Sequence, residues 1–294
     1  MRSRWIGWTA LLIPAAFAAA ADPPARGSEP ATLVDAAGKE IKLTGLKFGI
    51  GTRRLAFLAD AKGATDDARK GPLALELREP LSTTFQKGVV TLIPLSSVAG
   101  VKYDYAKLTM SVSIAGQPDA VGTLQFRGIN VFTVEAKAGD VPAKFTGGST
   151  KGGFRSIAFP GARPLSPRPA APKWSVQIVQ PAAMDPALTV RNLKALYAFP
   201  GGTEQLMDAL PVRKGEPLQL NAKIKKLEIV AVDPNTRMAA MELLLEGGTE
   251  RLIAVPLTLE QGKRTGVLTG LVGEVDSGWK LFPLHTVKAI KPAD

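Results

Sequence analysis

The sequence predicts an all-β protein, and three observations support that prediction. Short segments in which apolar and polar residues alternate recur along the chain, and the clearest is 108–114, where every second residue is apolar. Glycine and proline, 29 and 23 of the 294 residues, punctuate these segments as turn residues do. The strongest helical pattern is the short segment 203–210, with Thr203 as a cap and Pro211 as a stop. We therefore expect two tandem β domains with at most one or two short helices.

The N-terminus has the three parts of a secretory signal peptide, which we place at 1–21. The positively charged start consists of Arg2 and Arg4, and the apolar stretch is 5–17. The cleavage site is formed by Ala19, Ala21 and Asp22. A membrane anchor is the alternative, but a spanning helix needs about 20 apolar residues, and this stretch is shorter. Cleavage would leave the mature chain extracytoplasmic, in the periplasm, in the cell envelope or secreted. No integral membrane span would remain.

Composition also sets the domain boundaries. Residues 22–31 are rich in proline and small residues, which predicts a disordered leader. Residues 164–173 hold four prolines and predict an extended, exposed linker. We place a first β domain at 32–163 and a second at 174–294. Each is either one core or a pair of small barrel-like or sandwich-like units.

Taken in order, the first domain begins with a hairpin, 32–35 and 39–43, around the turn 36–38. The other segments with a β pattern in this domain are 51–58, 73–79, 88–94, 108–114, 122–126, 129–135 and 154–160. In the second domain the corresponding segments are 174–179, 218–220, 223–230, 238–245, 252–259 and 278–291.

Two of these segments, 88–102 and 278–291, share one construction. Each runs from a glycine through an apolar strand to Pro-Leu, two polar positions and a valine, with Val or Ile three residues later. This spacing predicts a single 3₁₀ turn between two strands. Weaker matches at Pro160 and Leu220 give a period of roughly 60 residues, as in repeat proteins. Either four related units exist, or the two middle matches are coincidental.

The Pro-Leu-x-x-Val-x-x-Val/Ile segment resembles the 3₁₀ turn that joins the last two strands of small SH3-like barrels. It is also similar to a segment of uncharacterised exported bacterial β-repeat proteins, and 31–97 has the same character. The resemblance implies small barrels but no activity, so no site residues are transferred from it.

The residue inventory restricts the chemistry. The chain has no cysteine and a single histidine, His285. These counts exclude disulfides, a cysteine nucleophile and metal sites with two histidine ligands. The position equivalent to His285 in 88–102 is Ser96, which favours an exposed turn position. We predict no cofactor, no metal and no catalytic residue.

Acidic pairs leave one catalytic alternative. Glu274 and Asp276 lie close in sequence, as do Asp60 and the pair Asp66 and Asp67. Glycosidases use two carboxylates that the fold brings together, and sequence spacing does not determine whether it does so here. A secreted carboxylate-dependent hydrolase is therefore kept as an alternative function.

Positive charge suggests a second alternative. The formal net charge is +11, which favours anionic partners. The most concentrated basic group comprises Arg213, Lys214, Lys223, Lys225 and Lys226. These residues are either an anion-binding stripe or a charged strand edge that prevents aggregation.

The sequence thus predicts an exported, non-enzymatic β-repeat protein that serves as a binding or structural module in or near the cell envelope. Its partner would be an anionic envelope polymer or another protein. The alternative that the positive charge suggests is recognition of an acidic glycan or other polyanion. Nucleic acid is disfavoured, because the aromatic residues are few and scattered.

Overall fold

The computed structural model describes residues 30–58, 71–78, 88–124, 130–148, 153–168, 170–179, 187–213, 216–220, 224–233 and 235–293. These residues form three antiparallel sheets, and their only helices are single 3₁₀ turns. The predicted all-β class is confirmed. The predicted signal peptide, with Ala19, Ala21 and Asp22, lies outside the described residues. Within the described ranges, no helix is long and apolar enough to cross a membrane.

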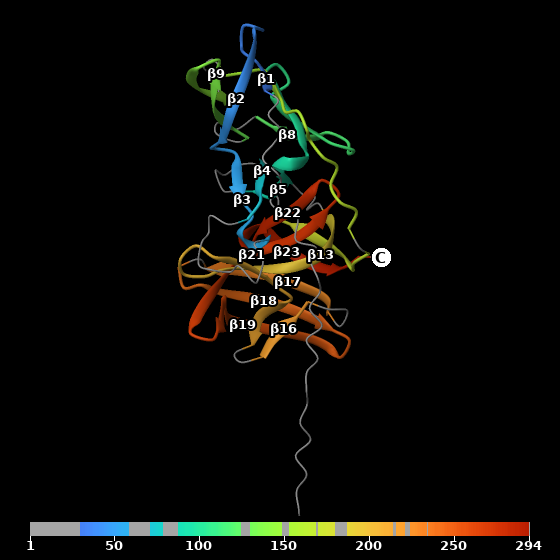
Figure 1. Cartoon of the computed structure of the whole chain (residues 1–294). Helices are drawn as coiled ribbons and strands as arrows, with labels where there is room; N and C mark the ends of the chain where they lie inside the picture. The colour runs from blue at the N-terminus through green and yellow to red at the C-terminus, as the bar shows by residue number, and fades with distance from the viewer. Residues whose placement is uncertain are drawn as a thin grey trace, which may run out of the picture.

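An eight-stranded sheet lies in the first half of the chain, at the top of Figure 1, in the order β10-β9-β2-β1-β11-β6-β7-β8. Its strands are β1 Ala31–Val34, β2 Glu40–Phe48, β6 Val98–Asp104, β7 Thr109–Ile114, β8 Ala120–Thr123, β9 Phe132–Ala138, β10 Val141–Gly147 and β11 Ser156–Ala158. The alternation predicted for 108–114 appears in β7, where Met110, Val112 and Ile114 are buried. Leu108 precedes the strand with φ 52° and is exposed, so it does not share that face.

A thirteen-stranded sheet includes most of the second half and three strands of the first. Its main path is β19-β18-β17-β23-β12-β13-β21-β22-β5-β4-β3. The strands from the first half are β3 Thr52–Arg54, β4 Leu73–Arg78 and β5 Val90–Pro94, and η1 Ala56–Leu58 follows β3. Those from the second half are β12 Lys173–Ile178, β13 Ala187–Ala198, β17 Ile224–Asp233, β18 Met238–Leu245, β19 Gly248–Pro256, β21 Arg264–Val275, β22 Gly278–Pro283 and β23 Val287–Pro292. Off this path, β14 Glu204–Met207 pairs with β13 and β20 Thr258–Gln261 with β21, while β15 Ala209–Arg213 and β16 Glu216–Gln219 form a hairpin.

The two halves follow the same path through five strand positions. In the second half the chain passes through β12, β13, β21 and β22, and β23 returns to pair with β12. In the first half it passes through β1, then through β2 and β3, which follow each other in sequence and share one position of the path, then through β4 and β5, and β6 returns toward β1. Of these strands, β2 belongs to the eight-stranded sheet and β3 to the thirteen-stranded sheet. There β11 lies between β6 and β1 and pairs with both.

Both predicted 3₁₀ turns are present, as η2 Leu95–Ser97 and η3 Leu284–Thr286. Pro94 and Pro283 precede them with φ of −53° and −54°, and Leu95 and Leu284 are both buried. At Pro160 the described chain forms an ordinary turn instead, and residue 221 lies outside the described residues. The proposed period of four units therefore stays a prediction.

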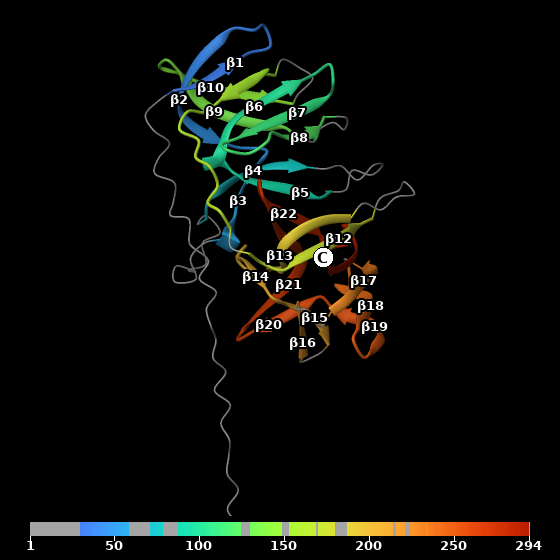
Figure 2. The same ribbon diagram turned by 90° about the vertical axis from the view of Figure 1, so that its right-hand side faces the viewer.

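A continuous junction joins the halves where β5 pairs with β22 and Leu92 lies opposite Trp279. Figures 1 and 2 show β3, β4, β5 and β22 between the two halves. Beside them lies a hydrophobic cluster with members from both halves, namely Leu55, Ala74, Val90, Leu92, Leu196, Val272 and Leu281. The division into domains at 164–173 stays a prediction, but each half alone would expose this cluster.

The helix predicted at 203–210 is wrong, because these residues belong to β14 and β15. Leu206 pairs with Leu196 of β13 and packs beside the junction cluster. Burial of this apolar residue and pairing with a neighbouring strand outweigh a weak local helix preference. Asp208, which was expected inside the helix, lies between the strands and bonds Lys194 through its carboxylate.

Candidate functional site

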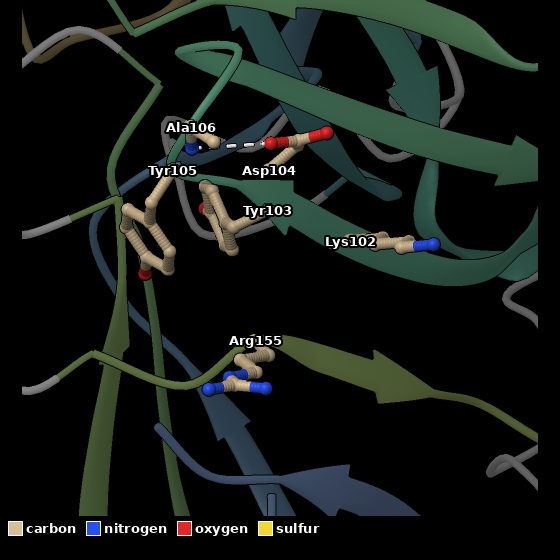
Figure 3. A pocket seen from close by; sticks show the side chains of 6 residues that line it. All are labelled: Lys102, Tyr103, Asp104, Tyr105, Ala106 and Arg155. Atoms are coloured by element: carbon tan, nitrogen blue, oxygen red, sulfur yellow. Dashed lines mark hydrogen bonds between the residues drawn. The ribbon is translucent and has the colours of Figure 1, made fainter. Parts of the chain in front are cut away.

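A pocket of about 370 Å³ opens at the end of β6 (Figure 3). It is lined by Lys102, Tyr103, Asp104, Tyr105, Ala106 and Arg155. Five of these residues are consecutive in sequence, in β6 and the turn after it, whereas Arg155 immediately precedes β11. The pocket thus lies where β11 enters between β6 and β1.

Backbone hydrogen bonds fix Arg155 between these strands. Its N–H donates to the Val34 carbonyl at 2.8 Å, and its carbonyl accepts from the Tyr103 N–H at 2.7 Å. Arg155 immediately precedes the three-residue strand β11, so it lies at the end of that strand. Its side chain is exposed. In Figure 3 its guanidinium lies across the open space from the two tyrosine rings.

Tyr103 and Tyr105 form the aromatic wall of the pocket. Their rings stack at 5.8 Å between centroids. The Tyr103 hydroxyl donates to the Asn130 carbonyl at 3.0 Å, and the Tyr105 hydroxyl donates to the Phe154 carbonyl at 2.9 Å. A Cβ on Gly147 would lie 2.1 Å from the Tyr103 ring, so only glycine leaves room for it. The rings are therefore held rigidly.

Burial governs the pKa of both phenols. It is the largest cause that raises the pKa of Tyr103, of which only 3% is exposed, and it also raises the pKa of the less buried Tyr105. A phenol with a raised pKa and an occupied hydroxyl is a poor general base or nucleophile. Tyr105, which is half-buried, can offer ring surface to a ligand rather than reactive oxygen.

The pocket lining has two positively charged residues and one negatively charged residue. The Asp104 carboxylate accepts from the Lys107 N–H at 2.9 Å and the Ala106 N–H at 3.1 Å. The hydrogen bond from Lys107 is the main cause that lowers the pKa of Asp104, and Lys102 contributes at longer range. Among the described residues, the charged ends of Lys102 and Arg155 make no hydrogen bond or salt bridge. Two exposed cations are therefore available to an anionic ligand.

The basic residues predicted to contact anions do not form a comparable site in the described part of the chain. Lys214 and Lys223 lie outside the described residues, and Arg213 is the last residue of β15. Lys225 is exposed, but Lys226 forms a 2.6 Å ion pair with Glu228 of the same strand. Their strand, β17, pairs with β18 on one side and, at Leu227 and Glu228, with β23 on the other, so it is not the outermost strand of its sheet. For the basic group as a whole, the choice between an anion-binding stripe and a charged edge stays a prediction.

The acidic pair Glu274 and Asp276 is occupied by structural contacts. Glu274 accepts from the Asn192 side-chain amide at 2.9 Å and lies 3.4 Å from the Arg168 guanidinium. Asp276 forms a 2.6 Å ion pair with Arg191. Each carboxylate thus has its own partner. The other predicted acids, at 60, 66 and 67, lie outside the described residues.

Arg168 belongs to the predicted linker, which was expected to be exposed throughout. Its guanidinium instead lies 4.3 Å from the centroid of the Trp279 ring, and its side chain is only 15% exposed. Desolvation is the main cause that lowers its pKa. His285 is exposed, as expected for its place in the turn. No group of three or more potential metal ligands occurs among the described residues.

Sequence reasoning did not identify the pocket. It placed Arg155 in a strand, within 154–160, and gave no function to 103–107. The available signal was Tyr103-Asp104-Tyr105, in which alternate positions place both rings on one side of the strand. Pairing of β6 with β11, which brings Arg155 beside them, could not be deduced from spacing. Comparisons of this chain with protein-family models, with curated proteins and with solved structures gave no match.

Proposed function

We propose that this protein is an extracytoplasmic, non-enzymatic binding module of the cell envelope, and that the pocket beside β6 is its ligand site. One observation carries the proposal. The pocket combines a rigid aromatic wall with two exposed cations, Lys102 and Arg155, that have no salt bridge among the described residues. Its volume falls within the range of about 300–1,000 Å³ that is usual for small-ligand sites. The predicted signal peptide supports an extracytoplasmic role.

Binding suits these residues better than catalysis. Both tyrosine hydroxyls donate to backbone carbonyls. The carboxylate of Asp104 is engaged by two backbone N–H groups and, in Figure 3, points away from the rings. A hydrolase would need a proton donor and a nucleophile or base facing one space, and the pocket lining offers no such pair.

The test uses the protein from residue 22 onward and insoluble cell-envelope material from the source cells. Ala106 is exposed at the pocket, so Ala106→Trp should fill the space without disturbing the packed rings. Ala37→Trp, at the exposed turn between β1 and β2, is the matched control. We expect the wild-type protein and the control to sediment with the envelopes and Ala106→Trp to stay in solution. Equal sedimentation of all three would reject the pocket as the ligand site.

A further inference from the structure

Resting on the proposed function, we infer that the pocket recognises the carboxylate of an acidic glycan, with Arg155 as the residue that binds it. The proposal moves the predicted anion contact from β17 to the entrance of β11. It also defines the ligand: one charged sugar unit in the pocket, carried on a polymer.

Arg155 has the properties of a carboxylate anchor. Its backbone is fixed on both sides, through Val34 and Tyr103. Its guanidinium is exposed and makes no hydrogen bond or salt bridge within the described residues, so its donors are free. A guanidinium presents parallel N–H groups that match the two oxygens of a carboxylate. Because the backbone is already ordered, only side-chain freedom is lost when a ligand binds.

Lys102 supports this anchor as a second, more distant charge. Lys102 lies opposite Ser156 in the pairing of β6 with β11, and Ser156 is the residue after Arg155. Figure 3 shows its side chain extending away from both Arg155 and the tyrosine rings. A compact ammonium in this place attracts an anion at a distance rather than orienting it. We therefore expect a smaller contribution from Lys102 than from Arg155.

The ring of Tyr105, which is supported by stacking on Tyr103, favours a sugar ring beside the charge. Tyr103 is fully packed, whereas Tyr105 is half-buried and keeps part of its ring at the pocket. Apolar and aromatic walls with a few polar groups are usual in sites for small organic ligands. A bare inorganic anion would not use this wall, because it has no apolar surface to bury against it.

Two other polyanions fit the described residues less well. Single-stranded nucleic acid is bound by a basic groove with successive aromatic platforms, whereas here one stacked pair lies in one pocket. A lipid surface needs a larger apolar area, and Leu108 is the only large apolar side chain on the adjoining described turn that is markedly exposed, at 45%. Isolated exposed leucines are common on soluble proteins.

The experiment compares two forms of one polymer. Polygalacturonate carries a carboxylate on each sugar, and its methyl ester has the same backbone without the charges. Titration calorimetry should show binding of the acid form that weakens by about tenfold or more on esterification, as the loss of a charge-assisted hydrogen bond implies. Vesicles of phosphatidylglycerol form a third arm, and binding to them that is tighter than to polygalacturonate would reject the glycan.

Substitutions then test which cation binds the carboxylate. Arg155→Gln should weaken binding of polygalacturonate by about tenfold, Arg155→Lys by less, and Lys102→Gln by roughly twofold to threefold. Lys137→Gln removes an equal charge from an exposed position of β9, a strand that does not line the pocket, and should leave the affinity within about twofold, since charges beyond roughly 10 Å are largely screened. All of these sites are exposed, so we expect unchanged unfolding curves. Equal losses for Arg155→Gln and Lys137→Gln would show diffuse attraction and overturn the inference.

The two proposals fail differently. If both polymer forms bind equally, Arg155→Gln has no effect, and Ala106→Trp still abolishes binding, then the pocket is a ligand site but not an acid-specific one. If Ala106→Trp binds polygalacturonate as the wild-type protein does, the pocket itself is rejected as the site.

Discussion

The two halves of the molecule use one chain path with different additions, and the addition in the first half creates the pocket. In the second half β23 pairs directly with β12, with Val176 opposite Ile290. In the first half β11 separates β6 from β1. Arg155 is the residue at which the chain enters that gap. The direct β23–β12 pairing leaves no equivalent position in the second half.

The extra strands also differ in place. In the second half they lie between β13 and β21 in sequence, and they extend the sheet beside β23 through β17, β18 and β19. In the first half they follow the return strand β6. Both arrangements keep the 3₁₀ turn, since it lies between the fourth and fifth strand positions. Because the turn is present in both halves, we infer that its role is structural. The two halves differ in their additional strands, and the pocket lies beside one of these.

The largest expected effect tests the equivalence of the two turns. Leu95 and Leu284 are each 4% exposed, but they pack in different cores. Replacing either with alanine should lower the free energy of unfolding by about 2–5 kcal/mol, the usual cost for a buried leucine. Denaturant titration measures both values. A large loss at one leucine and none at the other would break the comparison.

Adjacent exposed positions provide the controls for those leucines. Ser96→Ala and His285→Ala should change the free energy of unfolding by less than about 0.5 kcal/mol, as is usual for surface substitutions. His285 is exposed and Ser96 only partly covered. A loss at His285 comparable to that at Leu284 would mean that the histidine is packed rather than solvated.

A smaller effect is expected at the junction, where the halves meet asymmetrically. Gly278 has φ +146°, and a Cβ there would lie 2.1 Å from the carbonyl oxygen of Leu92. Gly278→Ala should therefore cost about 1–3 kcal/mol, as strained backbone positions do. Because the strain weakens β5–β22 pairing, we expect calorimetry to show one unfolding transition for the wild-type protein and a broadened or divided one for this variant. An unchanged profile would show that this pairing does not couple the halves.

The linker contact should contribute less again. Arg168→Ala removes both the ion pair with Glu274 and the stacking on Trp279. We expect a loss of about 1–2 kcal/mol in the free energy of unfolding, because the side chain is mostly buried. Lys107→Ala, in an ion pair whose lysine is 80% exposed, should change it by less than about 0.5 kcal/mol. Equal effects of the two substitutions would mean that the linker is not fastened at Arg168.

Local patterns predicted many strands but not the two longest. Residues 264–275 carry three glycines that weaken any strand pattern, yet they form β21. Those glycines permit close approach: a Cβ on Gly266 would meet the Phe199 ring, and one on Gly273 would meet Val190. Only the tightly packed sheet makes this composition favourable. The sequence of β13 mixes apolar spacings of both periods, so it indicates neither structure clearly.

The 3₁₀ turns were predictable because all their determinants lie within a few residues. Proline fixes the entry, and leucine and valine at i, i+3 face the core. The pocket was not predictable for the opposite reason. It needs Arg155 and Tyr103, fifty-odd positions apart in the numbering, to be joined by a backbone hydrogen bond between strands. Such long-range pairing depends on the whole sheet rather than on any local preference.

The smallest expected effect is a change in the pKa of a turn carboxylate, and it compares one turn from each half. Asp104 and Asp233 both bond the backbone N–H groups two and three residues ahead. Both have a pKa below the ordinary 3.8, so the stabilising contacts are complete above that pH and are lost as the pH falls through the lowered value. The main cause differs, because Asp233 also accepts a 2.8 Å hydrogen bond from the Thr236 hydroxyl.

Thr236→Val should therefore raise the pKa of Asp233 toward its ordinary value and leave the pKa of Asp104 unchanged. Titration of the carboxyl carbons by NMR measures both at once. An unmoved Asp233 would show that the backbone N–H groups, rather than the threonine hydroxyl, lower its pKa.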